Sequence, residues 1–157
     1  MDLMLAYDSS RNARIALDTV KTMFAQVKPA VTLITVVEDV GSSTAGVDDM
    51  FNDQYRAQKE GAEAAAAELV AEGWTAKVLL AEGDARKMIL RAVAEKEPDL
   101  LVMARHSHKP DKVPLGFIAK RLDALVEEFD HMTFGSTSAF LARRAPCPLL
   151  IIPTYAE

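Results

Sequence analysis

Short apolar runs alternate with longer amphipathic stretches along most of the chain. The runs are short and almost free of polar residues, which is typical of strands that are buried on both faces of a parallel sheet. They predict five strands, at residues 3–7, 31–37, 74–80, 100–104 and 149–152. The amphipathic stretches between them predict helices.

The first helix has clear boundaries in the sequence. Residues 8–10 supply side-chain oxygens that cap a helix start, and Lys28-Pro29 ends the helix. Between them, apolar residues recur at three- and four-residue spacing on one face as far as Val27. Further helices are predicted at about 49–72, with Gly73 after its end, at 85–93, and from 135 onward.

The regular exchange of strand and helix predicts an α/β fold. Such a rhythm gives a parallel sheet with helices on both faces, here a Rossmann-like sheet of order 3-2-1-4-5. We expect a single domain over residues 1–157. Ligands of such sheets bind at the carboxyl ends of the strands, so the predicted crevice lies where Asp8 and residues 104–107 converge.

Residues 109–133 do not fit this rhythm, because the segment is too long for an ordinary connection. Within it, residues 114–129 have the apolar spacing of an amphipathic helix. Three interpretations remain open for this inserted helix. It packs on its own domain, closes over the crevice as a lid, or forms the surface on which a partner protein docks.

Composition narrows the possible functions. The chain has 157 residues, a net charge of −5 and one cysteine. The acidic balance argues against a general nucleic-acid binder, and one cysteine excludes a disulfide framework within the chain. No apolar run approaches the roughly 18 residues that a membrane span needs. We therefore expect a cytoplasmic protein with neither nucleic acid nor a membrane as partner.

Residues 135–138, Gly-Ser-Thr-Ser, open the last predicted helix. Glycine allows close approach of a ligand to the backbone, and the first N–H groups of a helix attract anions. The same residues also suit an ordinary helix start. The chain has neither the phosphate-binding loop of nucleoside triphosphatases nor the glycine fingerprint of dinucleotide-binding folds.

Two other chemistries have little support in the sequence. His106 and His108 are two positions apart, but no acidic pattern completes a metal site. Ser136, His106 and Asp8 include the residue types of a catalytic triad, yet no nucleophile elbow surrounds the serine. Cys147 lies between two prolines and is predicted to be a small buried residue. We therefore predict no metal site and no catalytic residue.

Four stretches resemble the universal stress protein family, and together they cover nearly the whole chain. They are LMLAYDSS with the following RNARIALDTV, VTLITVVED, EGDARKMILRAVAEKEPDLLVMARHSH, and FGSTSAFLARRAPCPLLIIP. The last two are the most specific. The resemblance implies the five-stranded fold of the adenine nucleotide alpha hydrolase-like type and, in most members, a dimer.

Members of that family that bind nucleotides carry Gly-x2-Gly-x9-Gly-Ser/Thr after strand four. The resemblance places the corresponding candidate residues at Asp8, Val36, Met103, Ala104, His106, Ser107, Gly135, Ser136 and Thr137. The adjoining Ser9, Arg105 and Ser138 complete the candidate set. The implied ligand is ATP or another adenine nucleotide, with Mg²⁺.

The chain departs from this pattern on the phosphate side. Ala104 and Ser107 occupy the first two glycine positions, and Gly135 follows Ala104 by 31 positions. Ser9 stands where the family usually has glycine. The chain is therefore compatible with an adenine site, but the phosphate loop of the family is interrupted in this sequence. We expect ATP to bind weakly or not at all.

Two functions remain open at this point. One is a non-catalytic stress-response protein that binds an adenine nucleotide weakly, with at most slow ATP hydrolysis. The other is an interaction protein that binds no nucleotide and docks a partner on residues 114–129. In either case residues 149–152 would leave an exposed sheet edge in a monomer, so we expect a homodimer through that strand.

Overall fold

The computed structural model describes residues 1–38, 47–106 and 135–154, with the backbone alone for 47–51. It contains a five-stranded sheet in which every neighbouring pair is parallel and the strand order is β3-β2-β1-β4-β5. The strands are β1 (Asp2–Ala6), β2 (Ala30–Val37), β3 (Ala76–Glu82), β4 (Leu100–Ala104) and β5 (Leu149–Ile152). The predicted fold class and strand order are confirmed.

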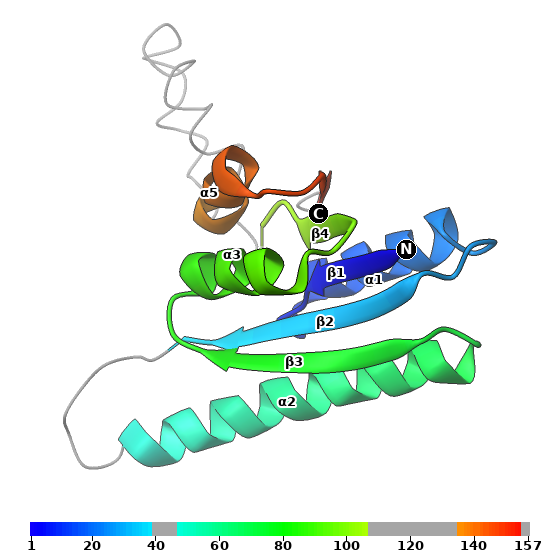
Figure 1. Cartoon of the computed structure of the whole chain (residues 1–157). Helices are drawn as coiled ribbons and strands as arrows, with labels where there is room; N and C mark the ends of the chain where they lie inside the picture. Colours follow the sequence, from blue (N-terminus) through cyan, green and yellow to red (C-terminus); the bar gives the residue numbers. More distant parts are fainter. Residues whose placement is uncertain (39–46, 107–134, 155–157) are drawn as a thin grey trace, which may run out of the picture.

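Helices cover both faces of the sheet (Figure 1). They are α1 (Arg11–Met23), α2 (Val47–Ala71), α3 (Ala85–Lys96) and α5 (Ser136–Arg144). The helices α1 and α2 pack on one face, and α3 and α5 pack on the other. This layering follows from the apolar strands, whose side chains alternate between two faces that both need cover.

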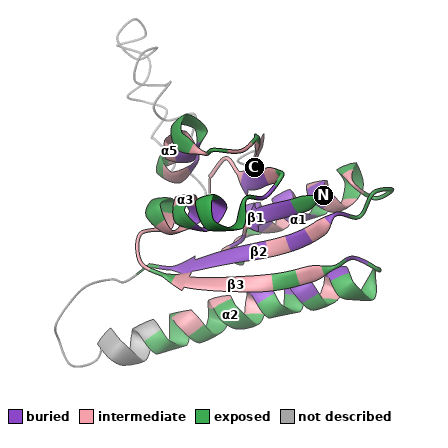
Figure 2. Ribbon diagram, in the orientation of Figure 1, coloured by how far each residue is buried: buried purple, intermediate pink, exposed green. Residues whose placement is uncertain are grey.

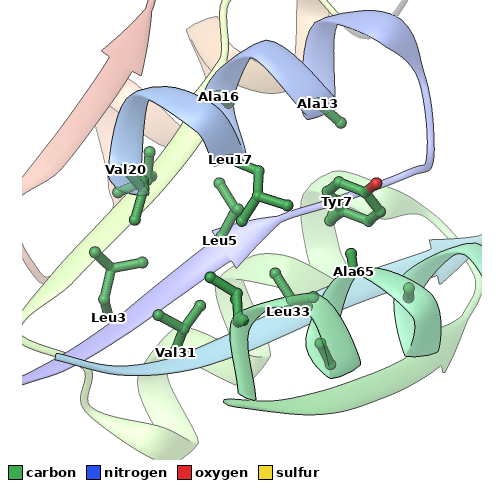
Figure 3. Close-up of a cluster of buried hydrophobic side chains, with 14 of the residues drawn as sticks. Leu3, Leu5, Tyr7, Ala13, Ala16, Leu17, Val20, Val31, Leu33 and Ala65 are labelled. Carbon is green, nitrogen blue, oxygen red and sulfur yellow. The ribbon is translucent and has the colours of Figure 1, made fainter. Parts of the chain in front are cut away.

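The core on the face of α1 and α2 is built from aliphatic side chains of the central strands (Figure 3). Leu5, Leu17 and Leu33 are completely buried there. Small residues of α2, among them Ala62 and Ala65, let that helix lie close to the sheet. Burial of each leucine stabilises the folded state by about 1.5–3 kcal/mol. These contacts therefore hold the central strands firmly in place.

The opposite face holds a second core of the same kind. Met4, Ile34 and Leu101 project from the central strands and pack with residues of α3 and α5, including Val93 and Leu141. Figure 2 shows the buried positions concentrated along the central strands, while the outer surfaces of the helices are exposed. Residues of β1, β2 and β4 are therefore held from both sides.

The first helix ends earlier than its apolar spacing predicts. It stops at Met23, and the backbone N–H groups of Val27 and Lys28 both donate to the carbonyl of Phe24 in the turn that follows. Met23 and Val27 are 59% and 65% exposed. The predicted burial of this end of the apolar face is wrong: Met23 is the last residue of the helix, and Val27 lies beyond it in the turn toward β2.

The third strand begins later than predicted. Trp74 precedes it and is 5% exposed, since its N–H donates to the Leu69 carbonyl and holds it against the end of α2. Gly73 makes this turn possible with a φ of 84°, as expected for a glycine that follows a helix. Hydrogen bonding to β2 then carries the strand on to Glu82.

Ion pairs join the two helices on the first face. Glu68 of α2 accepts hydrogen bonds from the Arg14 guanidinium at 2.6 and 2.7 Å and from Lys21 Nζ at 2.6 Å. The bonds from Arg14, then that from Lys21, lower the pKa of Glu68 to about 2. The carboxylate therefore stays charged and keeps α1 and α2 in register at neutral pH.

The predicted inserted helix, residues 114–129 within 109–133, lies outside the described residues. Its interpretation as a core element, lid or docking surface therefore stays a prediction. Among the residues that the structure does describe, no helix combines the length and the apolar character needed to cross a membrane.

Candidate functional site

A pocket of about 300 Å³ opens at the carboxyl ends of β1, β2 and β4. This is the edge at which a parallel sheet offers a crevice between diverging loops. One side of the pocket is apolar and is lined by Ala6, Ile34, Val36, Ile89 and Met103. Because Val36 and Met103 are nearly buried, this side suits a flat apolar group.

The turn after β1 brings Asp8 and Ser10 to the polar side of the pocket. Asp8 Oδ1 accepts a hydrogen bond from the Ser10 N–H at 3.0 Å, and Ser10 Oγ accepts one from the Ala13 N–H at 3.1 Å. The second bond caps α1. Ser9, between them, has a φ of 62°, a left-handed conformation that is uncommon outside glycine.

Gly61 of α2 makes room for Ser9. A Cβ built on Gly61 would lie 2.1 Å from Ser9 Oγ and 2.9 Å from Ser9 Cβ, far inside ordinary contact distance. Without a side chain at position 61, α2 can lie against the turn after β1. The same helix then contributes Gln54 and Gln58 to the wall of the pocket.

The end of β4 is joined directly to the start of α5. The Arg105 carbonyl accepts hydrogen bonds from the Gly135 N–H at 3.0 Å and from Ser138 Oγ at 2.8 Å. A Cβ on Gly135 would lie 3.0 Å from the same carbonyl oxygen and 3.4 Å from His106 Nδ1. Glycine therefore allows this close approach without a shift of its neighbours, and the approach brings the first turn of α5 to the pocket.

The N-terminus of α5 lacks a side-chain cap, unlike that of α3. Asp84 caps α3 by accepting from the Lys87 N–H at 3.2 Å, whereas Gly135 has no side chain that can accept. The pKa of Asp84 falls to about 2, because Arg86 and then the Lys87 N–H stabilise the carboxylate. The first N–H groups of any helix have no partner within it, and the first turn of α5 lines the pocket, so this turn can offer N–H donors to a ligand there.

Asn12 fixes the loop that follows β4 from the other side. Its side chain is buried, and its amide donates a hydrogen bond to the His106 carbonyl at 2.9 Å. The bond joins the start of α1 to residues 94 positions away in the chain. This bond therefore helps to hold together the two segments that frame the pocket.

Charge is distributed unevenly around the pocket. Asp8 and Glu38 bring two carboxylates to its lining, and Arg105 brings one guanidinium. Tyr7 lines the pocket as well, and burial raises the pKa of its phenol, although the positive charge of Arg14 acts in the opposite direction. The phenol is therefore neutral at physiological pH and contributes no charge.

Most of the candidate residues predicted from sequence converge on this pocket. Its lining includes Asp8, Val36, Met103, Ala104, Arg105, Gly135, Ser136, Thr137 and Ser138. Ser9 packs toward α2 instead, and His106 lies beside Gly135 without lining the pocket. Ser107 lies outside the described residues.

Sequence reasoning missed several residues of the lining. Ser10 was expected only as a helix cap, and Tyr7 only as the end of a strand. Glu38, Gln54 and Gln58 were not singled out, although they also line the pocket. No local signal marks these glutamines, because their position depends on how closely α2 approaches the turn after β1.

The residues around the pocket define the kind of ligand that it can hold. Within residues 1–38, 47–106 and 135–154, no group of three His, Cys, Asp or Glu side chains is placed to hold a metal ion. The described pocket instead combines an apolar slot, carboxylate and amide acceptors, and one uncapped helix N-terminus. Such a set fits a small molecule with an apolar part, hydroxyl groups and an anionic group.

The parallel sheet and the pocket between β1 and β4 define an α/β protein with a Rossmann-like fold. The model of the universal stress protein family matches residues 1–153, so the chain belongs to that family. A similarity search against curated protein sequences finds no significant match.

Several solved structures with a similar fold are universal stress proteins. One is UspA from Lactobacillus plantarum, with a TM-score of 0.69 and 19% identity over 97% of each chain. Another, in complex with cAMP, has a TM-score of 0.64 and 19% identity over 99% of this chain and 98% of its own. A third, from Arabidopsis thaliana with AMP bound, has a TM-score of 0.57 and 18% identity over 99% and 93%. At these identities the likeness establishes the fold alone.

Proposed function

We propose that this universal stress protein is a non-catalytic binding protein for an adenine nucleotide, and that it favours one phosphate over three. The observation that carries the proposal is the uncapped N-terminus of α5, which opens into a pocket with an apolar slot. The nucleotide complexes of two structurally similar universal stress proteins, with cAMP and with AMP, support the ligand class.

The base would occupy the apolar side of the pocket. Val36 and Met103 project from β2 and β4, the strands on either side of β1, and both line the slot. A purine ring buries a flat apolar surface against such side chains, and its edges find partners at the strand ends. This side contains no departure from the family's nucleotide-binding pattern.

The phosphate would lie against the first turn of α5. There the free N–H groups of the helix and the hydroxyls of Ser136 and Thr137 offer hydrogen bonds to an anion. One helix N-terminus accommodates one phosphate group. The pocket volume of about 300 Å³ lies at the lower end of ordinary ligand sites, which also favours a small nucleotide.

Further phosphates would find fewer backbone donors and a net negative lining, in which two carboxylates face one guanidinium. The Arg105 N–H donates to the Ile152 carbonyl, and the Gly135 N–H donates to Arg105, so neither is available to a ligand. Asp8 and Glu38 line the pocket and repel added negative charge. Each charged hydrogen bond that a glycine loop would supply is worth about 1.5–3 kcal/mol. Loss of two weakens triphosphate binding by a few hundredfold or more.

A thermal-shift panel tests this proposal. AMP is expected to raise the melting temperature of the wild-type protein more than ATP at equal concentration, because a ligand stabilises the state to which it binds. The rise in melting temperature with ADP should fall between those with AMP and ATP. Added Mg²⁺ should increase the rise caused by ATP more than the rise caused by AMP. A larger shift with ATP than with AMP, or a low-micromolar Kd for ATP, would contradict the expectation that the interrupted phosphate loop weakens triphosphate binding. No shift with any adenine nucleotide would reject the proposed function.

The assembly is a second part of the proposal. In the described sheet β5 is an edge strand of four residues, three of which are partly exposed leucine or isoleucine. Such an edge favours pairing with another chain. The carbonyls of Pro148 and Ile152 accept hydrogen bonds from β4. Backbone groups of successive residues point to opposite sides of a strand, so the N–H and carbonyl of Ile151 face the open edge. We expect a homodimer that pairs there.

The variant Ile151→Pro is expected to weaken this dimer about tenfold or more, since it removes one outward N–H from each protomer. Ile151→Val keeps the N–H and serves as the matched control, which should remain dimeric. Light scattering across a dilution series measures the change, and circular dichroism checks that both variants are folded. A monomeric wild type, or equal dimerisation of the two variants, would count against the edge contact.

A further inference from the structure

The helix α2 supplies a polar wall to the pocket that the family's glycine motif does not include. Gln54 and Gln58 both line the pocket and are four residues apart, so they lie on one face of the helix. Gln58 is the more enclosed of the two. Its Oε1 is buried and receives no hydrogen bond from any residue that the structure describes.

A buried amide oxygen without a partner is unfavourable, since it has lost its water and gained nothing in exchange. Among the described residues no hydrogen bond accounts for the buried Oε1 of Gln58, whereas most buried polar groups have a partner. The terminal torsion of a glutamine side chain is broad, so rotation about it can turn the oxygen toward the pocket that the residue lines. There a ligand that donates a hydrogen bond would satisfy it.

The position of Gln58 identifies the part of the ligand that it meets. Gly61 lies three residues further along α2, on the same side of the helix, and it contacts Ser9 in the turn after β1. Asp8 belongs to that turn and lines the same pocket. Asp8 and Gln58 therefore line the pocket from two elements that touch, and the carboxylate and the amide oxygen are both hydrogen-bond acceptors.

The other parts of the proposed ligand already have suitable surroundings. An anionic phosphate is repelled by Asp8, and an apolar ring surface fits the slot at Val36 and Met103. The groups of a nucleotide that donate hydrogen bonds and carry no charge are the sugar hydroxyls and the amine of the base. With the base in the slot, the hydroxyls are the donors left for the polar wall.

We infer that Gln58 is a specificity-determining residue that accepts a hydrogen bond from a sugar hydroxyl of the bound nucleotide, and so selects ribonucleotides over deoxyribonucleotides. The inference rests on the proposed function and deepens it. Gln54 belongs to the same wall but is exposed to solvent, which weakens any bond that it makes.

Calorimetric titrations with AMP, 2′-deoxy-AMP and 3′-deoxy-AMP test the inference. The wild type is expected to bind AMP about 3- to 10-fold more tightly than one of the deoxy analogues, the usual effect of one lost hydrogen bond. Gln58→Met keeps the length of the side chain without its polar atoms. It should bind AMP about 3- to 10-fold more weakly and lose the discrimination between the sugars.

Two further measurements separate recognition from folding. The ligand-free melting temperature of Gln58→Met should equal or exceed that of the wild type, because the variant removes an unsatisfied buried oxygen. Gln26→Met, in the exposed turn after α1, makes the same chemical change away from the pocket and should bind all three probes as the wild type does.

The possible failures are distinguishable. Wild-type protein that binds none of the three nucleotides contradicts the proposed function, and the inference with it. Wild-type protein that binds AMP, with unchanged affinity and sugar discrimination in Gln58→Met, overturns this inference alone. A clear fall in the ligand-free melting temperature of Gln58→Met also overturns it, since the amide would then support the fold.

Discussion

Gly61→Ala is expected to destabilise the protein by about 1–3 kcal/mol, the usual cost of forcing an added group into a filled contact. The new Cβ would lie 2.1 Å from Ser9 Oγ and 2.9 Å from Ser9 Cβ. Rotation of the Ser9 hydroxyl relieves the first clash but leaves the second. Either α2 or the turn after β1 must therefore move, and both carry residues of the pocket.

A second substitution makes this prediction specific. Ser9→Gly removes both clashing atoms and suits the φ of 62° at position 9. The double variant Ser9→Gly/Gly61→Ala should therefore recover most of the stability that Gly61→Ala loses. Urea unfolding of the wild type, both single variants and the double variant measures the coupling directly. If the effects of the two substitutions on the free energy of unfolding were additive, the contact between residues 9 and 61 would not be the cause of the destabilisation.

Gly135→Ala is expected to weaken AMP binding by about tenfold or more and to lower stability by about 1–3 kcal/mol. The new methyl group would stand 3.0 Å from the Arg105 carbonyl oxygen, a backbone atom that cannot rotate away. The first turn of α5 and the end of β4 must then move apart by a few tenths of an ångström. This movement takes the free helix N–H groups away from the proposed phosphate position.

A matched control distinguishes this local effect from general loss of stability. Gly73→Ala also destabilises the fold, because residue 73 has a φ of 84°, but it lies at the far end of α2 from Gln54 and Gln58. It should leave the AMP affinity unchanged, as measured by calorimetry well below the melting temperature. Equal losses of AMP affinity in the two variants would contradict a local role of Gly135 in phosphate binding.

The fold was predictable because its signals are local. Five apolar runs without alternation can be buried only in a sheet covered on both faces, and the helices between them require parallel strands. The errors fall where packing overrides the pattern. Val27 continues the apolar spacing of α1, but the turn at Phe24 leaves it exposed, and Trp74 is apolar yet belongs to the end of α2.

The pocket was predictable only in part, for the same physical reason. Asp8, Val36 and Gly135 lie at strand or helix ends, where topology alone brings residues together. Asn12 and Gln58 gain their positions from contacts between elements that are distant in the chain. Neither the polarity nor the spacing of these two residues differs from that of ordinary helical surface positions, so sequence gives no sign of them.

The central claim is that AMP lies with its phosphate against the N-terminus of α5. Amide chemical shifts of isotope-labelled wild-type protein, followed through a titration with AMP, test it most directly. The amides of Ser136 and Thr137 are expected to shift saturably, together with those of Val36 and Met103, while Lys77 at the opposite end of the sheet remains unchanged. Saturable shifts confined to other parts of the chain, or no shifts at millimolar AMP, would contradict the claim.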